Sequence, residues 1–397
     1  MHLLIMQSSK KLKILYIHNN YYLPSGEEHS ADAIAALLQE NGHKVYWYRR
    51  SSTELDKMFM GKIRAIWLSI YNPGAVKDIK KIIKDIKPDI VQIQNLYPLI
   101  SPRVLKTIKA MGIPVVMRCP NYRLFCPTGL FFDNNNEICE KCTGWGGELW
   151  CILKNCTGSR SKSIGYAIRN YVARITGVFI KYVDVFIVQS DFQRSKFVEH
   201  RISENRIEIL PGITPEVKAS KVHTSDGCIT YVGRISPEKG IDDFLSAASL
   251  LPDLKFSIAG EVTKRFKFKN SPTNVVWHGF LESTKLDELF EESAVLVVPS
   301  RCYEGFPNVI PRAMNHSKPV ITTDFGCFPD IIDHGVNGFL YPSGNIHKLV
   351  EHIQWIVRNP DDASRMGQNG REKAAREYSQ EVIYKRLIEI YSKTLGN

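Results

Sequence analysis

Two basic residues lie at an expected strand-to-helix junction in the second half of this 397-residue sequence. Arg234 and Lys239 lie in the segment 232–240, VGRISPEKG, which follows an expected strand and opens an expected helix. Arginine offers phosphate a bidentate fork, lysine adds a mobile point charge, and the N-terminal end of a helix attracts anions. The segment indicates a phosphate site, although a solvated helix cap carries similar residues.

A second motif of the same kind contains a carboxylate. The segment 298–308, VPSRCYEGFPN, again joins an expected strand to an expected helix, and Glu304 lies at its centre. Ala313, Met314 and the segment 318–321, KPVI, follow it. Two strand-to-helix junctions with charged side chains favour a ligand site over a pair of helix caps.

The elements that position these motifs follow from the hydrophobic pattern, in which short apolar runs alternate with amphipathic stretches, as in parallel α/β sheets. In the first half we predict strands at 13–18, 45–48, 89–94, 114–117, 185–189 and 206–210, and helices at 28–40, 75–86, 102–110, 164–182 and 192–199. In the second half we predict strands at 229–232, 255–259, 275–278, 295–298 and 319–322, and helices at 237–249, 285–292, 308–316 and 346–358, with one or two more in the last 30 residues.

This pattern predicts an α/β protein with two doubly wound domains in series. We place the first domain at residues 1–212, a linker at 213–226 and the second domain at residues 227–375. A terminal helix, 376–397, is expected to return to the first domain. In such sheets a ligand lies in the cleft between the strand ends.

In their order along the chain, the motifs resemble those of the retaining glycosyltransferases of family four, which have GT-B architecture. The family carries G-R-x-x-x-x-K-G, here at 233–240, and later E-G/S-F-G/P, here at 304–307. The segments 24–27, 89–95, 330–332 and 335–340 resemble further landmarks of the family. The resemblance covers nearly the whole chain.

The resemblance implies a role for each matching residue. Arg234 and Lys239 grip the donor diphosphate, Glu304 hydrogen-bonds the donor sugar, and these three are the catalytic residues. The implied donor-binding set is Gly26, Gly233, Arg234, Lys239, Gly305, Phe306, Pro307, Asn308 and Arg312. The implied reaction is a front-side displacement that needs no enzyme nucleophile and no catalytic metal, with leaving-group charge stabilised by the two cations.

Three departures from the family pattern occur, at four positions. Arg312 replaces the family's second glutamate, Pro120 replaces a histidine, and Gln92 and Gln94 replace histidines of the first domain. An arginine cannot accept the ribose hydroxyl protons as a carboxylate does. The sequence therefore leaves an alternative, a non-catalytic nucleotide-sugar-binding or scaffold subunit. A sugar-nucleotide epimerase on the same fold fits the order of the motifs less well.

A cysteine-rich insertion at 119–156 contains six of the nine cysteines. The predicted metal ligands are Cys126, Cys139, Cys142 and Cys156, with a Cys-x-x-Cys pair at the middle. Thiolates in such knuckles favour tetrahedral zinc, and a structural zinc and free buried thiols remain equal alternatives, with a redox cluster behind them. A subset of family-four enzymes carries a similar insertion near the acceptor side.

The charge of the chain is uneven. Residues 1–215 hold 30 Lys and Arg against 18 Asp and Glu, whereas the remainder holds 22 against 23. A basic half suits an anionic membrane, an acidic substrate or nucleic acid, and no nucleic-acid-binding signature accompanies it. We expect binding to an anionic membrane through Lys77, Lys80, Lys81 and Lys84 and neighbouring Tyr and Trp side chains, with solubility charge as the alternative.

The complete prediction is a hexosyltransferase of cell-surface polysaccharide biosynthesis. Its donor is a nucleotide diphosphate sugar and its acceptor a glycan or a lipid-linked saccharide. The N-terminus lacks the layout of a secretory signal, and no run of about 18 uncharged apolar residues occurs. We therefore expect a cytoplasmic protein at the inner face of the cell membrane.

Overall fold

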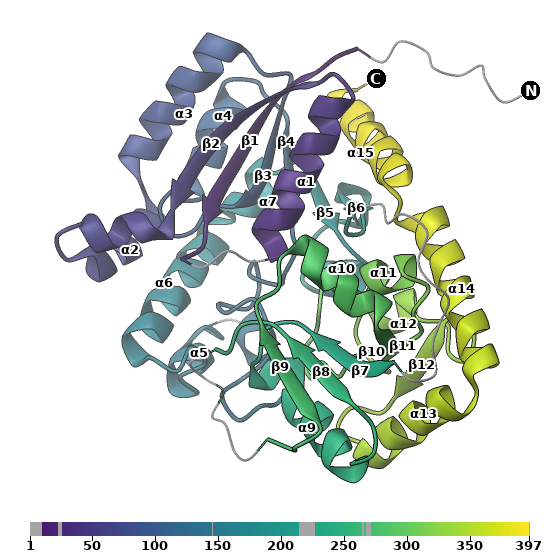
Figure 1. The fold of residues 1–397 in the computed structure, drawn as a ribbon. Coiled ribbons are helices and arrows are strands. Elements are labelled where there is room, and N and C mark those ends of the chain that lie inside the picture. Colours follow the sequence, from purple (N-terminus) through teal and green to yellow (C-terminus); the bar gives the residue numbers. More distant parts are fainter. Residues whose placement is uncertain are drawn as a thin grey trace, which may run out of the picture.

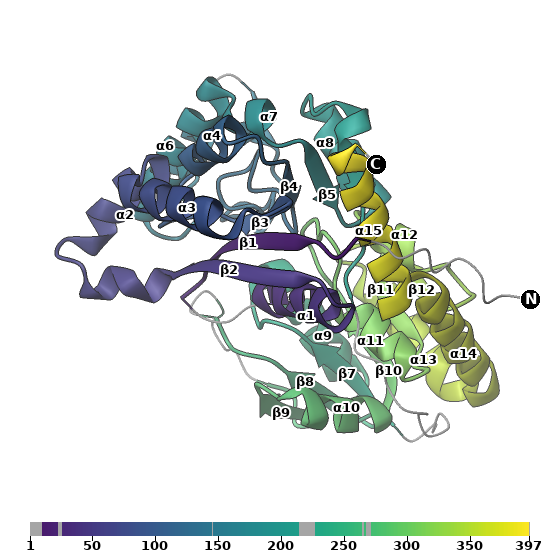
Figure 2. The same cartoon turned by 90° about the horizontal axis from the view of Figure 1, so that it is seen from above.

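The computed structural model describes residues 10–22, 26–144, 146–213, 227–263, 266 and 271–396. These residues form two parallel six-stranded sheets, each in its own domain, with helices on both faces (Figures 1 and 2). The predicted linker, apart from Ile213, lies outside the described residues. Two Rossmann-like domains in series confirm the predicted fold class.

The first sheet has the order β2-β1-β3-β4-β5-β6. Its strands are β1 (Lys13–Asn20), β2 (Lys44–Ser51), β3 (Ile90–Asn95), β4 (Val115–Arg118), β5 (Val185–Val188) and β6 (Ile207–Ile209). Its helices are α1 (Gly26–Glu40), α2 (Gly61–Ile70), α3 (Pro73–Ile86), α4 (Arg103–Ala110), α5 (Leu149–Leu153), α6 (Arg160–Thr176), α7 (Val178–Tyr182) and α8 (Asp191–Glu199), with a 3-10 turn η1 (Ser52–Lys57).

The second sheet has the order β12-β11-β10-β7-β8-β9. Its strands are β7 (Cys228–Val232), β8 (Phe256–Ala259), β9 (Val275–Gly279), β10 (Ser293–Val298), β11 (Val320–Thr323) and β12 (Gly338–Tyr341). Its helical elements are η4 (Pro237–Lys239), α9 (Ile241–Leu250), α10 (Ser283–Glu291), α11 (Val309–Asn315), α12 (Phe328–Ile331), α13 (Ile346–Arg358) and α14 (Pro360–Glu377).

Buried strands at the centre of each sheet explain why the pattern was readable. Every residue of β3, β4 and β10 is buried, as expected for parallel strands covered by helices on both faces. All the predicted strands are present, and the sequence analysis missed β12. The predicted helix 164–182 is divided into α6 and α7 at Gly177, whose φ is +61°.

The last helix returns to the first domain, as predicted. Helix α15 (Gln380–Leu395) packs Ile383, Leu387 and Ile390 into the core formed with β1 and α1. The Tyr391 hydroxyl also donates a hydrogen bond to Gln92 Oε1 of β3. Gln92, one of the departures from the family pattern, is therefore part of the contact that anchors α15.

Candidate active site

The two charged motifs leave the second sheet at the point where its strand order reverses. Strands β7 and β10 are parallel neighbours, with Ile229 paired to Val295. The chain continues from β7 to β8 on one side and from β10 to β11 on the other. Loops that follow such a pair diverge and leave a crevice at the carboxyl ends of the strands. The segments 233–240 and 299–308 begin at this crevice.

The two loops are joined by backbone and side-chain contacts. The Arg301 N–H donates to the Glu238 carbonyl oxygen at 3.0 Å, and the Arg301 guanidinium forms an ion pair with Asp243 of α9. Gly240 has φ +68°, and a Cβ there would lie 1.7 Å from the Pro299 carbonyl oxygen. A glycine is required at this position, because the two loops touch through backbone atoms.

Lys239 and Glu304 form an ion pair across this junction. Their side chains are 21% and 13% exposed, and the Ser300 hydroxyl donates to Glu304 Oε1 at 2.7 Å. Burial opposes ionisation of Glu304, but the Lys239 ammonium and the hydrogen bonds from Lys239 and Ser300 hold its pKa below the ordinary value. Burial likewise disfavours the charged form of Lys239, and Glu304 overcomes it and raises the pKa. Both groups are charged at neutral pH.

Arg234 occupies the outer side of the same loop. Its side chain is 54% exposed, and its Nη2 atom lies 3.5 Å from Glu238 Oε1. Glu238 itself is buried. The loop therefore presents one exposed and one enclosed cation just before the N-terminal end of α9, which suits a diphosphate.

The Glu304 loop also touches the first domain. The Tyr122 hydroxyl donates to the Glu304 carbonyl oxygen at 3.1 Å. A Cβ at Gly305 would lie 2.7 Å from both the Pro120 carbonyl oxygen and Gln189 Oε1. Pro120 and Gln189 follow β4 and β5, so the carboxyl ends of strands from both sheets meet at the site. The Glu304 loop therefore lies where the two domains meet.

A buried polar cluster of the first domain was missed by the sequence analysis. The Tyr21 hydroxyl donates to Glu27 Oε2 at 2.6 Å, and Asn121 Nδ2 donates to the same oxygen at 3.2 Å. Arg123 Nη1 donates to the Tyr21 hydroxyl and to Asn95 Oδ1. Burial raises the pKa of Glu27, although Arg123 opposes the shift. A cavity of about 20 Å³ beside Asn95, Asn121 and Arg123 is large enough for one water molecule.

Four of the other residues predicted to bind the donor lie in the two loops of the site. Phe306 and Pro307 are buried beside Glu304, and Asn308 caps α11 without a side-chain hydrogen bond. Gly233 joins β7 to the Arg234 loop.

Gly26 and Arg312 are less directly connected to the site. Gly26 begins α1, and a Cβ there would meet no atom within 4 Å, so no steric demand explains a glycine. Residues 24 and 25 of the predicted phosphate loop lie outside the described residues. Arg312 lies on α11, and its guanidinium binds Asp287 and Ser283 of α10. The observed partners of Arg312 are thus residues of α10. Its contact with the donor stays a prediction.

Comparison with known proteins agrees with this two-domain architecture. The match over residues 214–373 is to the glycosyl transferases group 1. The structure of Anabaena HepE in complex with UDP aligns with a TM-score of 0.65 at 14% identity, covering 96% of this chain and 100% of that chain. The chain has the GT-B fold.

Two relatives show how far the likeness extends beyond the GT-B fold. The uncharacterized 42.6 kDa protein in the cps region of Klebsiella pneumoniae is 26% identical over 304 residues, which cover 75% of this chain and 72% of that protein. The poly(ribitol-phosphate) alpha-N-acetylglucosaminyltransferase of Staphylococcus aureus (strain COL) is 28% identical over 247 residues. That alignment covers 59% of this chain and 48% of the relative, so the chain spans about half the length of that protein.

The cysteine-rich insertion lies in the first GT-B domain. Cys142, Cys151 and Cys156 pack together with Ala167 of α6, and all nine cysteines are free thiols. Burial raises the pKa of Cys142, which keeps this thiol neutral. Within the described ranges, no group of three or more His, Cys, Asp or Glu is placed so that it could hold a metal ion. Zinc held by Cys126, Cys139, Cys142 and Cys156 therefore stays a prediction from the sequence.

Proposed function

We propose that the protein is a retaining glycosyltransferase that moves a hexose from a nucleotide diphosphate sugar to a glycan or lipid-linked saccharide in cell-surface polysaccharide biosynthesis. The observation that carries the proposal is the Lys239–Glu304 ion pair at the reversal point of the second sheet, closed from the other side by Tyr122 and Pro120. This arrangement brings a carboxylate and phosphate-binding cations to one enclosed place.

The proposed chemistry uses these charges in two ways. Arg234 and Lys239 stabilise the negative charge that develops on the departing diphosphate, and the positive end of α9 adds to them. Glu304 accepts hydrogen bonds from the sugar hydroxyls, so donor binding replaces part of its contact with Lys239. The acceptor attacks from the same face that the diphosphate leaves, and the anomeric configuration is retained.

Similar proteins support the donor and acceptor classes. HepE has been solved with UDP and with UDP-glucose, which supports a nucleotide diphosphate sugar as donor. The Klebsiella pneumoniae relative lies in a cps region, and the Staphylococcus aureus relative is named for transfer of N-acetylglucosamine to poly(ribitol-phosphate). These names favour a surface polymer or its precursor as acceptor. We infer a cytoplasmic location with reversible membrane association from the same class of acceptor.

The experiment has two stages. Thermal shift against UDP-, GDP- and ADP-sugars identifies the donor, because a ligand at 100 times its Kd stabilises by about 2.7 kcal/mol. Nuclear magnetic resonance of the slow hydrolysis then follows the anomer that is released first. Release of the same anomer as in the donor supports retention, and the opposite anomer contradicts it. Arg234→Ala serves as the control, since it removes an exposed cation and leaves the fold intact.

One observation favours a second candidate, a subunit that binds a nucleotide sugar without turnover. The position of the family's second glutamate is Arg312, and it is bound to Asp287 and Ser283. A non-catalytic subunit would show the thermal shift but release no nucleotide diphosphate. Measurable release that disappears in Glu304→Gln decides for the enzyme.

A further inference from the structure

Helix α6 presents an uncovered apolar stripe to solvent. Ile164, Ile168, Tyr171 and Ile175 follow one another at spacings of four, three and four residues, which places them on one side of the helix. Their side chains are between 39% and 57% exposed. Within a folded domain such a stripe normally faces the core, so this helix carries a second apolar side that no described element covers.

The two neighbouring helices extend this surface. Ile66 of α2 lies over Gly165 of α6, with Cγ1 3.0 Å from the Cβ position, and Cys151 of α5 packs with Ala167. At 100° per residue, Gly165 and Ala167 flank the stripe on opposite sides. Helices α2 and α5 therefore border it, as the left-hand side of Figure 1 shows.

Both border helices add exposed apolar side chains of their own. Trp67 of α2 is 67% exposed, and Leu149 and Leu153 of α5 are 62% and 74% exposed. We call the exposed apolar side chains of α2, α5 and α6 the apolar face.

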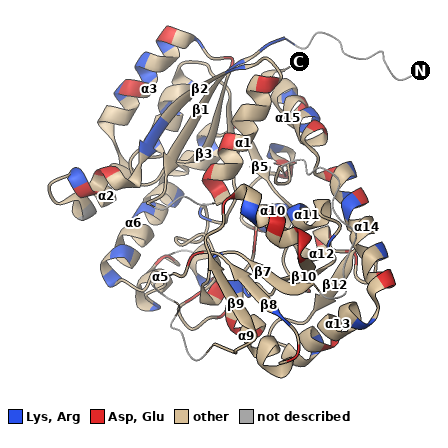
Figure 3. Cartoon of the chain, in the orientation of Figure 1, with Lys and Arg blue, Asp and Glu red and all other residues tan. Residues whose placement is uncertain are grey.

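The charge around the apolar face is predominantly positive. Residues 149–182 contain six Lys and Arg and neither Asp nor Glu, and residues 57–72 contain three and likewise neither. Two of these cations are paired with acidic residues outside the segments, Arg174 with Glu148 and Lys154 with Asp133. Figure 3 shows basic segments along α6. Helix α3, by contrast, combines the exposed Lys77, Lys80, Lys81 and Lys84 with acidic residues, and its apolar side chains turn inward. The four lysines predicted from sequence to bind membranes therefore lie on a helix whose own buried apolar side chains face the core.

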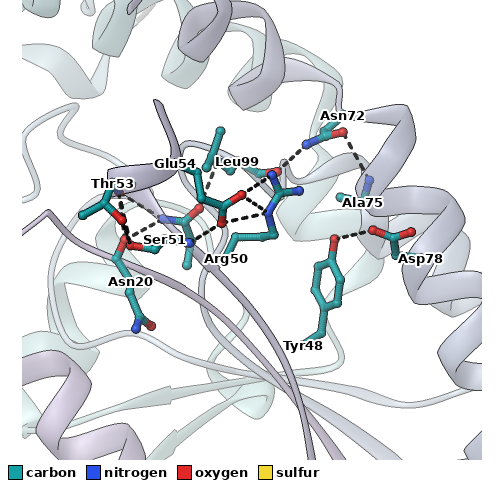
Figure 4. A network of polar contacts seen from close by, with 12 residues as sticks. Asn20, Tyr48, Arg50, Ser51, Thr53, Glu54, Asn72, Ala75, Asp78 and Leu99 are labelled. Atoms are coloured by element: carbon teal, nitrogen blue, oxygen red, sulfur yellow. Dashed lines mark hydrogen bonds and ion pairs between the residues drawn. The ribbon is translucent and has the colours of Figure 1, made fainter. Parts of the chain in front are cut away.

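Polar contacts fix the segments on both sides of α2. Before the helix, Arg50 forms an ion pair with Glu54, and Ser51 and Glu54 form a capping box on η1 (Figure 4). After the helix, Asn72 caps α3 through the Ala75 N–H at 3.2 Å and donates to the Leu99 carbonyl oxygen. The exposure of Trp67 is therefore a built feature and not the fraying of a chain end.

We propose that the apolar face docks the first domain onto an anionic lipid leaflet, with the apolar and aromatic side chains in the interface and the basic residues among the head groups. This combination of exposed apolar residues, tryptophan and net positive charge is the chemistry of interfacial membrane binding. A second copy of the chain fits poorly, because it would bring the same positive charges together. None of the described helices is long and apolar enough to cross a bilayer, so docking would be peripheral. The inference rests on the proposed function only for the lipid-linked acceptor.

The test measures binding without turnover. Full-length protein is sedimented with vesicles of phosphatidylcholine alone, or of equal parts phosphatidylcholine and phosphatidylglycerol. We expect binding only to the anionic vesicles, with a steep fall between low and physiological salt. The double variant Trp67→Glu/Ile168→Glu should bind these vesicles at least about tenfold more weakly than the wild type. Leu250→Glu, at an exposed apolar position of the second domain, is the matched control and should bind normally.

Three outcomes would overturn the proposal: unchanged binding of the double variant, loss of binding in Lys80→Glu/Lys81→Glu alone, or a dimer in vesicle-free solution that the double variant abolishes. Each altered side chain is exposed, so melting temperatures close to that of the wild type verify the fold. Release of nucleotide diphosphate in solution is measured in parallel. Docking without release contradicts the proposed function but supports docking through the apolar face. Release without docking supports the proposed function and contradicts docking.

Discussion

Replacing Lys239 with alanine removes the cation that keeps Glu304 ionised in an enclosed site. In the wild type, Glu304 is 13% exposed and has two close polar partners, Lys239 and the Ser300 hydroxyl. In the variant the Ser300 hydrogen bond remains, but burial then dominates. We therefore expect the pKa of Glu304 to move from below its ordinary value to above it.

The magnitude follows from the burial of the pair. Removing one partner of a buried ion pair costs about 3–5 kcal/mol, and the 21% exposure of Lys239 places this site near 3 kcal/mol. For a domain of this size, that is a fall in Tm of roughly 6–12 °C. Lys348→Ala is the matched control, because Lys348 and Glu351 are 39% and 65% exposed, and its effect should stay below about 1 kcal/mol.

The pH dependence distinguishes this explanation from simple loss of packing. The lowered pKa of Glu304 contributes stability that is present above the unfolded-state pKa and is lost as pH falls through the folded-state pKa. In Lys239→Ala the sign is reversed, so the variant is destabilised at neutral pH and recovers as Glu304 becomes protonated. The difference in Tm between the two proteins should therefore be largest near pH 7 and shrink in acid.

The activity assay measures nucleotide diphosphate release by a coupled reaction. Loss of a cation that contacts the departing phosphate should lower kcat/KM roughly 30- to 1000-fold. This corresponds to about 2–4 kcal/mol of lost transition-state stabilisation. The double variant Lys239→Met/Glu304→Gln, which removes both charges, should regain stability without regaining activity. The reasoning is refuted if Lys239→Ala melts like the wild type at all pH values, or turns over donor at the wild-type rate.

The other predictions concern single contacts. Arg234→Ala should weaken transition-state stabilisation by about 2–4 kcal/mol, measured as a lower kcat/KM. Its Tm should change little, because the side chain is 54% exposed. A wild-type rate would contradict a place for Arg234 in the diphosphate site. Gly305→Ala should impair turnover, since a methyl group there would lie 2.7 Å from the Pro120 carbonyl oxygen, and unchanged kinetics would contradict the observed domain contact. Cys142→Ser should lower Tm, because it places a hydroxyl among buried thiols. Elemental analysis of the same samples tests the zinc prediction: about one zinc in the wild type and none in the variant would support it, and metal-free wild type would reject it.

The sequence predicted the sheets well because their central strands are apolar on both faces. It missed α2 because this helix begins after Met60, in the left-handed region, without a side-chain cap, and because its apolar residues do not all face the core. The four-residue edge strand β12 follows a glycine-rich turn and offers too short a run. The helix predicted at 164–182 was wrong only in its continuity, since Gly177 adopts a left-handed conformation inside an otherwise helical pattern.

The sequence located the loops of the site but not the contacts between them. Nothing in the spacing of Lys239 and Glu304 reveals that they form an ion pair, because two loops far apart in the chain meet only when β7 and β10 become neighbours. The interdomain hydrogen bond from Tyr122 depends on how the two sheets face each other, which no local pattern records. The direction of Arg312 toward α10 was equally hidden, since Asp287 lies on another helix.

The return of α15 to the first domain determines how the two domains can move. The chain passes between them twice, once between residues 213 and 227 and again between α14 and α15, where Tyr378 ends one helix and Gln380 begins the next. Any movement of one domain relative to the other must therefore accommodate both crossings, and cutting the chain at Ser379 would remove one of them while leaving both sheets covalently intact.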